Sequence, residues 1–168
     1  RGSLTYIKNT VEEYLSYQPE PYELLIDSQT VKEKAFLVAC GNASQYGNNA
    51  FIAPHANIQD GKMDITILSP FGPLDIAPLA IQLFTKQIDR NSKIKTFKGK
   101  EVTIIRQNPG VMHLDGEPIM ADSRIEISVL PKSLNVLTPE TVSFTEEVQN
   151  LFGEVTRFFD KKLPYIFR

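Results

Sequence analysis

Residues 111–117 place the tightest restriction on how this chain can fold, because an alternating segment runs there directly into an Asp-Gly pair. In an extended strand successive side chains point to opposite faces, so residues 111, 113 and 115 share one face and residues 112 and 114 the other. Gly116 tolerates the positive φ of a tight turn, and Asp-Gly between extended runs is a strong hairpin signal. The sequence therefore predicts a β-hairpin whose end carries the carboxylates of Asp115 and Glu117.

This hairpin end has two interpretations. In the first, it is a solvated turn, and Asp115 and Gly116 serve only its geometry. In the second, a rigid strand end presents Asp115 as a catalytic base with Glu117 beside it, because a base must be held in position to accept a proton. The remaining sequence has to distinguish between the two.

Composition and length limit the class of protein. The 168 residues are enough for one domain with a proper core, and a net charge of −2 gives no reason to expect a nucleic-acid partner. The single Cys40 lies in an apolar run and is predicted to be a buried small hydrophobe. No apolar run reaches the roughly 18 residues that span a bilayer, and nothing resembles a secretory signal, which favours a reducing, cytoplasmic location. Because the chain does not begin with Met, we expect it to be a piece of a longer protein.

Many short strands with turn signals and few helices predict a mainly β fold, an antiparallel β-sandwich with added helices. The main domain is expected to span residues 1–138, and residues 139–168 to form an amphipathic helix that packs on this domain or on another one. Further helices are expected at residues 3–17 and 78–88, the second with Ile81, Phe84 and Ile88 in one stripe. Strands are expected at residues 22–27, 35–40 (more deeply buried), 63–68, 93–97, 101–106, 111–114, 119–120, 124–129 and 133–137.

Several other features each allow a plain and a functional interpretation. His55 and His113 are the only histidines, and a Ser-His-Asp hydrolase built from them has little support. The second Asp-Gly pair, Asp60-Gly61, is either a simple turn or a site where the carboxylate and nearby backbone carbonyls hold a hard cation. Five basic residues form either a solvated strand edge or a surface that attracts an anionic membrane; they are Arg90, Lys93, Lys95, Lys98 and Lys100.

Five short motifs together resemble one known family. In order they are Gly41-Asn42, Tyr46-Gly47, Ile52-Ala53-Pro54-His55-Ala56, Asp60-Gly61-Lys62-Met63-Asp64-Ile65 and Leu114-Asp115-Gly116-Glu117. They resemble the C-terminal domain of the diacylglycerol kinase and sphingosine kinase superfamily, and the bacterial lipid-kinase branch is the nearest match. The resemblance covers about residues 1–138, including an opening segment similar to the one that leads into that domain.

The resemblance implies a two-domain, ATP-dependent lipid kinase that phosphorylates a hydroxyl of a diacylglycerol-like or sphingoid-like lipid. An N-terminal domain would carry a Gly-Gly-Asp-Gly nucleotide loop, which this chain lacks, so the chain alone is expected to be inactive. By analogy Asp115 is the general base that takes the proton from the lipid hydroxyl, and Glu117 supports the site. A structural Mg²⁺ would be held by the Asp60 side chain and by the backbone carbonyls of Asn57 and Lys62.

The same resemblance implies a set of partners and a location. The partners would be the lipid substrate, the N-terminal nucleotide-binding domain and a peripheral membrane surface, while a homodimer is left open. The protein would be cytoplasmic, would visit the inner membrane surface transiently and would serve phospholipid biosynthesis. One departure from the family is that Gly47-Asn48-Asn49 stands where a run of glycines is usual, although Asn tolerates left-handed backbone well.

Two rival interpretations stay open. The chain could be a non-catalytic β-sandwich binding or interaction module whose Asp-Gly pairs are only turns. It could also be kin to the NAD kinases, which share this architecture by analogy, although the Asp-Gly-Glu ending suits the lipid kinases better.

Overall fold

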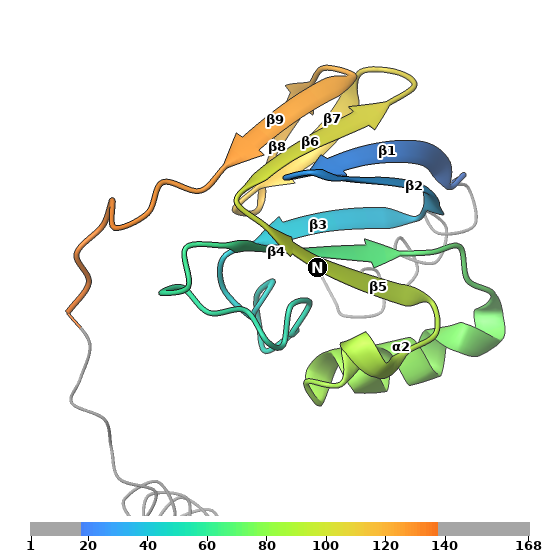
Figure 1. Cartoon of the computed structure of the whole chain (residues 1–168). Helices are drawn as coiled ribbons and strands as arrows, with labels where there is room; N and C mark the ends of the chain where they lie inside the picture. Colours follow the sequence, from blue (N-terminus) through green and yellow to red (C-terminus); the bar gives the residue numbers. More distant parts are fainter. Residues whose placement is uncertain (1–17, 138–168) are drawn as a thin grey trace, which may run out of the picture. The chain divides into compact units, whose positions relative to one another are not determined.

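A computed structural model of the chain describes residues 18–137, and the strands and helices within this range lie in the first of two units, residues 1–132 and 133–168. The expected helices at residues 3–17 and 139–168 lie outside the described residues. Every strand pairing in the described range is antiparallel, and the strands form two larger sheets and one hairpin (Figure 1). The predicted mainly β fold with an added helix is confirmed.

The first sheet has four strands in the order β2-β1-β6-β9 and the second has three in the order β3-β4-β5, while β7 pairs with β8 alone. The bounds of the first sheet are β1 Glu20–Ile26, β2 Gln29–Ala35, β6 Glu101–Arg106 and β9 Arg124–Ser128. Those of the second sheet are β3 Leu37–Gly41, β4 Met63–Leu68 and β5 Ile94–Gly99, and the hairpin consists of β7 Gly110–Leu114 and β8 Glu117–Ala121.

One apolar core joins the two larger sheets. Strands β1, β2 and β6 contribute side chains from one sheet, and β4 contributes them from the other, so the sheets bury their inner faces against each other. Each fully buried Leu or Ile stabilises the fold by about 1.5–3 kcal/mol relative to an exposed one. The buried members are Leu24, Ile26, Val31, Ala35, Met63, Ile65, Ile67, Val102 and Ile104.

Strand β4 is buried on both faces, although its sequence alternates apolar and polar residues. The polar residues Asp64 and Thr66 are 8% and 2% exposed, because the segment around residues 51–55 covers the face opposite the core. The Thr66 hydroxyl satisfies its hydrogen-bonding need by donating to the Ile52 carbonyl at 2.9 Å. Asp64 is therefore a carboxylate inside the fold, and it needs a cation nearby.

Cys40 on β3 is half-buried, rather than fully buried as predicted. It packs against the main core, and burial raises the pKa of its thiol to about 12. The thiol therefore stays protonated at neutral pH and acts as a small apolar side chain.

Three expectations about the strands were wrong. Strand β2 was missed because its sequence is mostly polar; pairing with β1 along its whole length holds it in the sheet. Strand β3 is partly exposed rather than more deeply buried. Residues 133–137 form no strand.

The helix is shorter than predicted, and the face that it buries is not the predicted one. Helix α2 spans Ile76–Phe84 after the 3₁₀ turn η1 (Pro73–Asp75), and a second 3₁₀ turn, η2, spans Ile88–Arg90. Lys86 has φ 59°, which interrupts the expected helix. Leu79 and Ile88 pack with Ile94 of β5, whereas Ile81 and Phe84 are exposed, so the expected stripe was wrong. Among the helices of residues 18–137, none is both long and apolar enough to cross a bilayer.

The Asp27 side chain fixes the point where the chain crosses between the sheets. Its Oδ1 accepts the backbone N–H groups of Lys100 and Glu101 at 2.9 and 3.0 Å, and its own N–H donates to the Glu101 carbonyl at 2.9 Å. Gly99 precedes the crossover, and a Cβ there would lie 2.6 Å from Cγ2 of Ile26. These contacts tie the β1–β2 turn to the crossover, which sets the relative position of the two sheets at this edge.

This contact predicts a pH-dependent stability. The backbone N–H groups of Glu101 and Lys100 hold the pKa of Asp27 below its usual value of 3.8. A carboxyl group whose pKa is lowered by folding stabilises the folded state above its unfolded pKa, and this stabilisation is lost as pH falls through the folded pKa. Asp27→Asn, which keeps the left-handed φ of 49° accessible, should lower Tm at pH 7. The difference in Tm from wild type should shrink below about pH 4; a constant difference in thermal melts would contradict the role of the charge.

Candidate functional site

The predicted hairpin forms with Asp115 at its end. Leu114 pairs with Glu117, so Asp115 and Gly116 are the two turn residues, and their φ values are 50° and 92°. Two consecutive positive φ values match the tight turn that Asp-Gly favours. The predicted hairpin is therefore confirmed, and it holds Asp115 in a fixed backbone conformation.

The hairpin end is exposed in this chain. Asp115, Glu117 and His113 are all exposed, and so are the apolar side chains of Val111 (60%) and Met120 (72%). A two-stranded ribbon is at best marginally stable by itself, so the hairpin needs support from elsewhere in the fold.

The Arg106 side chain, from the last residue of β6, supports the open end of this hairpin. Its Nη2 donates to the carbonyls of Gly110 and Ala121 at 2.7 and 2.6 Å, one on each strand of the hairpin. Its Nε donates to the Asp122 carbonyl at 3.2 Å. A Cβ on Gly110 would lie 3.3 Å from Nη1 of Arg106, so the glycine leaves room for the guanidinium. Arg106 thereby connects the hairpin that carries Asp115 to the sandwich.

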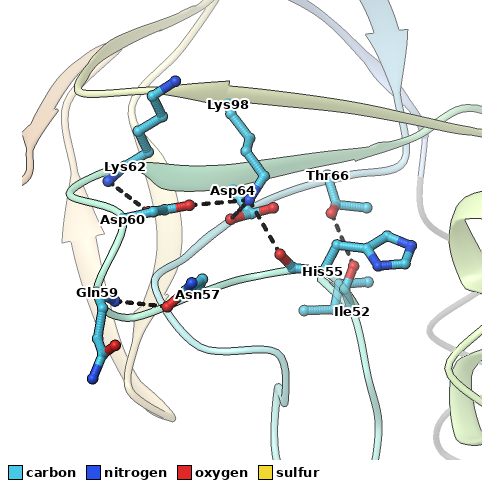
Figure 2. Close-up of polar contacts among 9 residues, drawn as sticks. All are labelled: Ile52, His55, Asn57, Gln59, Asp60, Lys62, Asp64, Thr66 and Lys98. Atoms are coloured by element: carbon cyan, nitrogen blue, oxygen red, sulfur yellow. Dashed lines mark hydrogen bonds and ion pairs between the residues drawn. The ribbon is translucent and has the colours of Figure 1, made fainter.

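The second predicted site is the turn before β4. The Asp60 Oδ1 accepts the Lys62 backbone N–H at 2.8 Å (Figure 2). The Asp60 N–H donates to the Asn57 carbonyl at 3.2 Å. Gly61, at φ 66°, completes the turn. The structure thus brings Asn57, Asp60 and Lys62 together, while no described hydrogen bond or ion pair joins them to Asp115 or Glu117 within residues 18–137.

Lys98 from β5 reaches this turn. Its Nζ lies 3.2 Å from Oδ2 of Asp60, 3.2 Å from Oδ2 of Asp64 and 3.1 Å from the His55 carbonyl oxygen (Figure 2). The Lys62 N–H, and then Lys98, hold the pKa of Asp60 below its usual value. Partial burial opposes the charged form of Lys98, but the carboxylates of Asp64 and Asp60 outweigh it and raise the pKa of the lysine. Asp60 and Lys98 are therefore both charged at neutral pH.

The donor chemistry of the Asp60 turn suits a hard cation. It offers a carboxylate that stays ionised, with the Asn57 backbone carbonyl beside it, and oxygen is the ligand that Mg²⁺ prefers. Within residues 18–137 no group of three His, Cys, Asp or Glu side chains could hold a metal, so backbone oxygens would have to contribute.

Other residues that the sequence singled out have structural partners. The unusual Gly47-Asn48-Asn49 turn forms, with φ values of 46° and 61° at the two asparagines, so asparagine does tolerate this backbone. The His55 Nε2 lies 3.2 Å from Oδ2 of Asp89. Three of the five basic residues pair with carboxylates: Lys93 with Asp75, Lys95 with Glu33 and Lys98 with Asp60 and Asp64.

Comparison with known proteins identifies the family. Residues 1–138 match the family model described as "YegS C-terminal NAD kinase beta sandwich-like domain". The chain is 27% identical over 143 residues to a protein named diacylglycerol kinase from Mycobacterium tuberculosis, covering 82% of this chain and 44% of the relative. It is 28% identical over 125 residues to a "Probable lipid kinase YegS-like" from Shewanella frigidimarina, covering 74% and 40%.

Solved structures show the same fold. A crystal structure titled as a diacylglycerol kinase from Bacillus anthracis superposes with a TM-score of 0.59 at 22% identity, over 77% of this chain and 44% of that one. The chain thus spans less than half the length of these relatives. Because the family model covers most of the chain, the chain belongs to the family of YegS C-terminal, NAD kinase β-sandwich-like domains.

Proposed function

We propose that this chain is the lipid-binding, base-supplying C-terminal domain of an ATP-dependent lipid kinase. The observation that carries the proposal is the position of Asp115. A tight turn fixes its backbone, Arg106 supports the hairpin behind it, and its side chain is exposed where another domain could face it. The names of the relatives, which include diacylglycerol kinase and lipid kinase, supply the reaction class.

In the proposed reaction Asp115 accepts the proton of a lipid hydroxyl. The hydroxyl oxygen then bonds to the γ-phosphorus of ATP as the bond to the bridging oxygen of ADP breaks, and the carboxyl group later returns its proton to solvent. Phosphoryl transfer depends chiefly on positioning and on charge stabilisation, so a base on a rigid strand end is well suited to it. Glu117, directly after the turn, would support the site beside the base.

The N-terminal nucleotide-binding domain of the two-domain protein is part of this proposal, since the relatives are more than twice as long as the matched region. A Mg²⁺ would be held by the Asp60 carboxylate with the Asn57 and Lys62 carbonyls. When bound, it would supply positive charge that stiffens the turn before β4. The Asp60 side chain already orients this turn by accepting the Lys62 N–H.

Transient contact with the inner face of the cytoplasmic membrane is also proposed, because the substrate is a lipid. The segment formed by η1 and α2 exposes the apolar side chains of Leu74 (93%), Ile81 (64%) and Phe84 (56%), with Lys86 following. Apolar side chains beside a lysine suit the boundary between headgroups and acyl chains.

The test is a transfer assay with the full-length two-domain protein. Labelled ATP and a panel of diacylglycerol, monoacylglycerol and sphingoid base in mixed micelles should yield a labelled lipid phosphate with at least one acceptor. Micelles without an acceptor lipid provide the control. If no lipid in the panel were labelled by a folded, ATP-binding protein, a non-catalytic β-sandwich module would be the better description.

A further inference from the structure

Three oxygen atoms around the Lys98 ammonium form a small cation site at the surface, with buried Asp64 at its inner end. They are Oδ2 of Asp60, Oδ2 of Asp64 and the His55 carbonyl oxygen, all within 3.1–3.2 Å of Nζ. They come from three places in the chain: the turn before β4, β4 itself and the loop over β4 (Figure 2). Converging oxygens are also the environment that a hard metal ion requires.

The charges of this cluster explain why a cation is needed there. Oδ2 of Asp64 is buried, and a buried carboxylate is costly unless a positive charge lies beside it. Lys98 provides that charge by direct contact, and the Lys62 ammonium also acts on Asp60 from further away. The Lys98 ammonium therefore already occupies the position that a metal cation would take beside the Asp60 carboxylate.

The ammonium and a bound metal would need the same oxygen of Asp60. Oδ1 is engaged by the Lys62 N–H, and Oδ2 is the atom that Lys98 contacts. Lys98 and Asp64 also line a cleft of about 190 Å³, which leaves space for several water molecules and for a displaced ammonium.

We propose that Lys98 competes with Mg²⁺ for the Asp60 carboxylate and so sets the metal affinity of this turn. The inference rests on the metal site of the proposed function and adds the residue that regulates it. With Lys98 in contact with Asp60, the turn is ordered without metal; Mg²⁺ binds only as the ammonium moves toward Asp64 and the cleft. Lys98 is thus a built-in counter-ion that makes metal binding weak and reversible.

The test is a Mg²⁺ titration of the nucleotide-free, full-length protein by calorimetry. Lys98→Met keeps most of the side-chain length but removes the charge and should tighten Mg²⁺ binding by about tenfold or more, because a neighbouring positive charge disappears. Lys95→Met is the matched control, since Lys95 lies on the same strand and pairs with Glu33 instead; it should bind Mg²⁺ like wild type. Adding Asp60→Asn to Lys98→Met should abolish the gain.

A second variant guards against misfolding, since Lys98→Met leaves the Asp64 charge without its partner. Lys98→Met with Asp64→Asn removes both charges, keeps the net charge of the cluster and should still bind Mg²⁺ more tightly than wild type. If both variants bound Mg²⁺ with wild-type affinity, competition would be refuted while the metal site stood. If neither the wild type nor any variant bound Mg²⁺, the metal site would fail as well, whereas the kinase activity would still be judged by lipid phosphorylation.

Discussion

Asp115→Asn in the full-length two-domain protein should lower the turnover number for lipid phosphorylation by about 10²-fold or more, while the protein stays folded. Asparagine has nearly the same shape as aspartate and tolerates the left-handed backbone at φ 50°, so the turn should survive. An amide cannot accept the hydroxyl proton, so the loss should appear in the chemical step. The measurement is the initial rate at saturating ATP and lipid, with circular dichroism to verify folding.

Asp122→Asn is the matched control for this experiment. Asp122 is an exposed aspartate just beyond β8, so the control makes the same chemical change close to the hairpin but away from its tip. It should retain most of the activity, because only the Asp122 backbone carbonyl, which the substitution preserves, contacts Arg106. Near-normal turnover in Asp115→Asn would remove Asp115 from the role of base, and equal losses in both variants would point to a general charge effect.

The sequence predicts best where local chemistry decides the structure. The Asp115–Gly116 turn and strands β4 and β6 were predicted well, since turn residues and apolar runs act over a few positions. Strand β2 could not be found in this way, because its partner β1 rather than its own polar sequence holds it extended. The early end of α2 depends on Lys86, a residue type that gives no warning of a positive φ.

The same distinction between local and long-range contacts applies to the residues of the candidate sites. The family resemblance assigned Asn57, Asp60 and Lys62 to one site, and these residues are close neighbours in the chain. It gave no sign that Lys98 belongs to this turn, since Lys98 lies 38 residues from Asp60 and reaches it only once β4 and β5 pair in the observed register. Arg106 was missed for a related reason: its contacts require β6 to end beside the base of the hairpin. Residues that support a site from another strand become visible only when the sheet pairing is known.

Arg106→Met should reduce lipid phosphorylation by up to about 10²-fold, although Arg106 itself touches no reacting atom in the proposed mechanism. Its guanidinium holds both strands of the hairpin through the carbonyls of Gly110 and Ala121. Without these contacts the two-stranded ribbon can shift, and a displacement of about 1 Å at a reacting group is enough for such a loss. Because the nucleotide would bind to the other domain, the turnover number should fall while the KM for ATP changes little.

Two further variants distinguish a positioning role of Arg106 from a general loss of stability. Arg124→Met removes another arginine, on β9, that pairs with Glu126 at the surface, and it should leave the activity near wild type. Arg106→Lys should recover part of the activity, since an ammonium can reach one of the carbonyls but cannot bridge both strands as a planar guanidinium does. Hydrogen exchange should then quicken in residues 110–121 of Arg106→Met, while the amides of β1 and β6 stay protected. If protection were lost throughout the sandwich, Arg106 would be a stability residue of the whole fold rather than the support of the hairpin that carries Asp115.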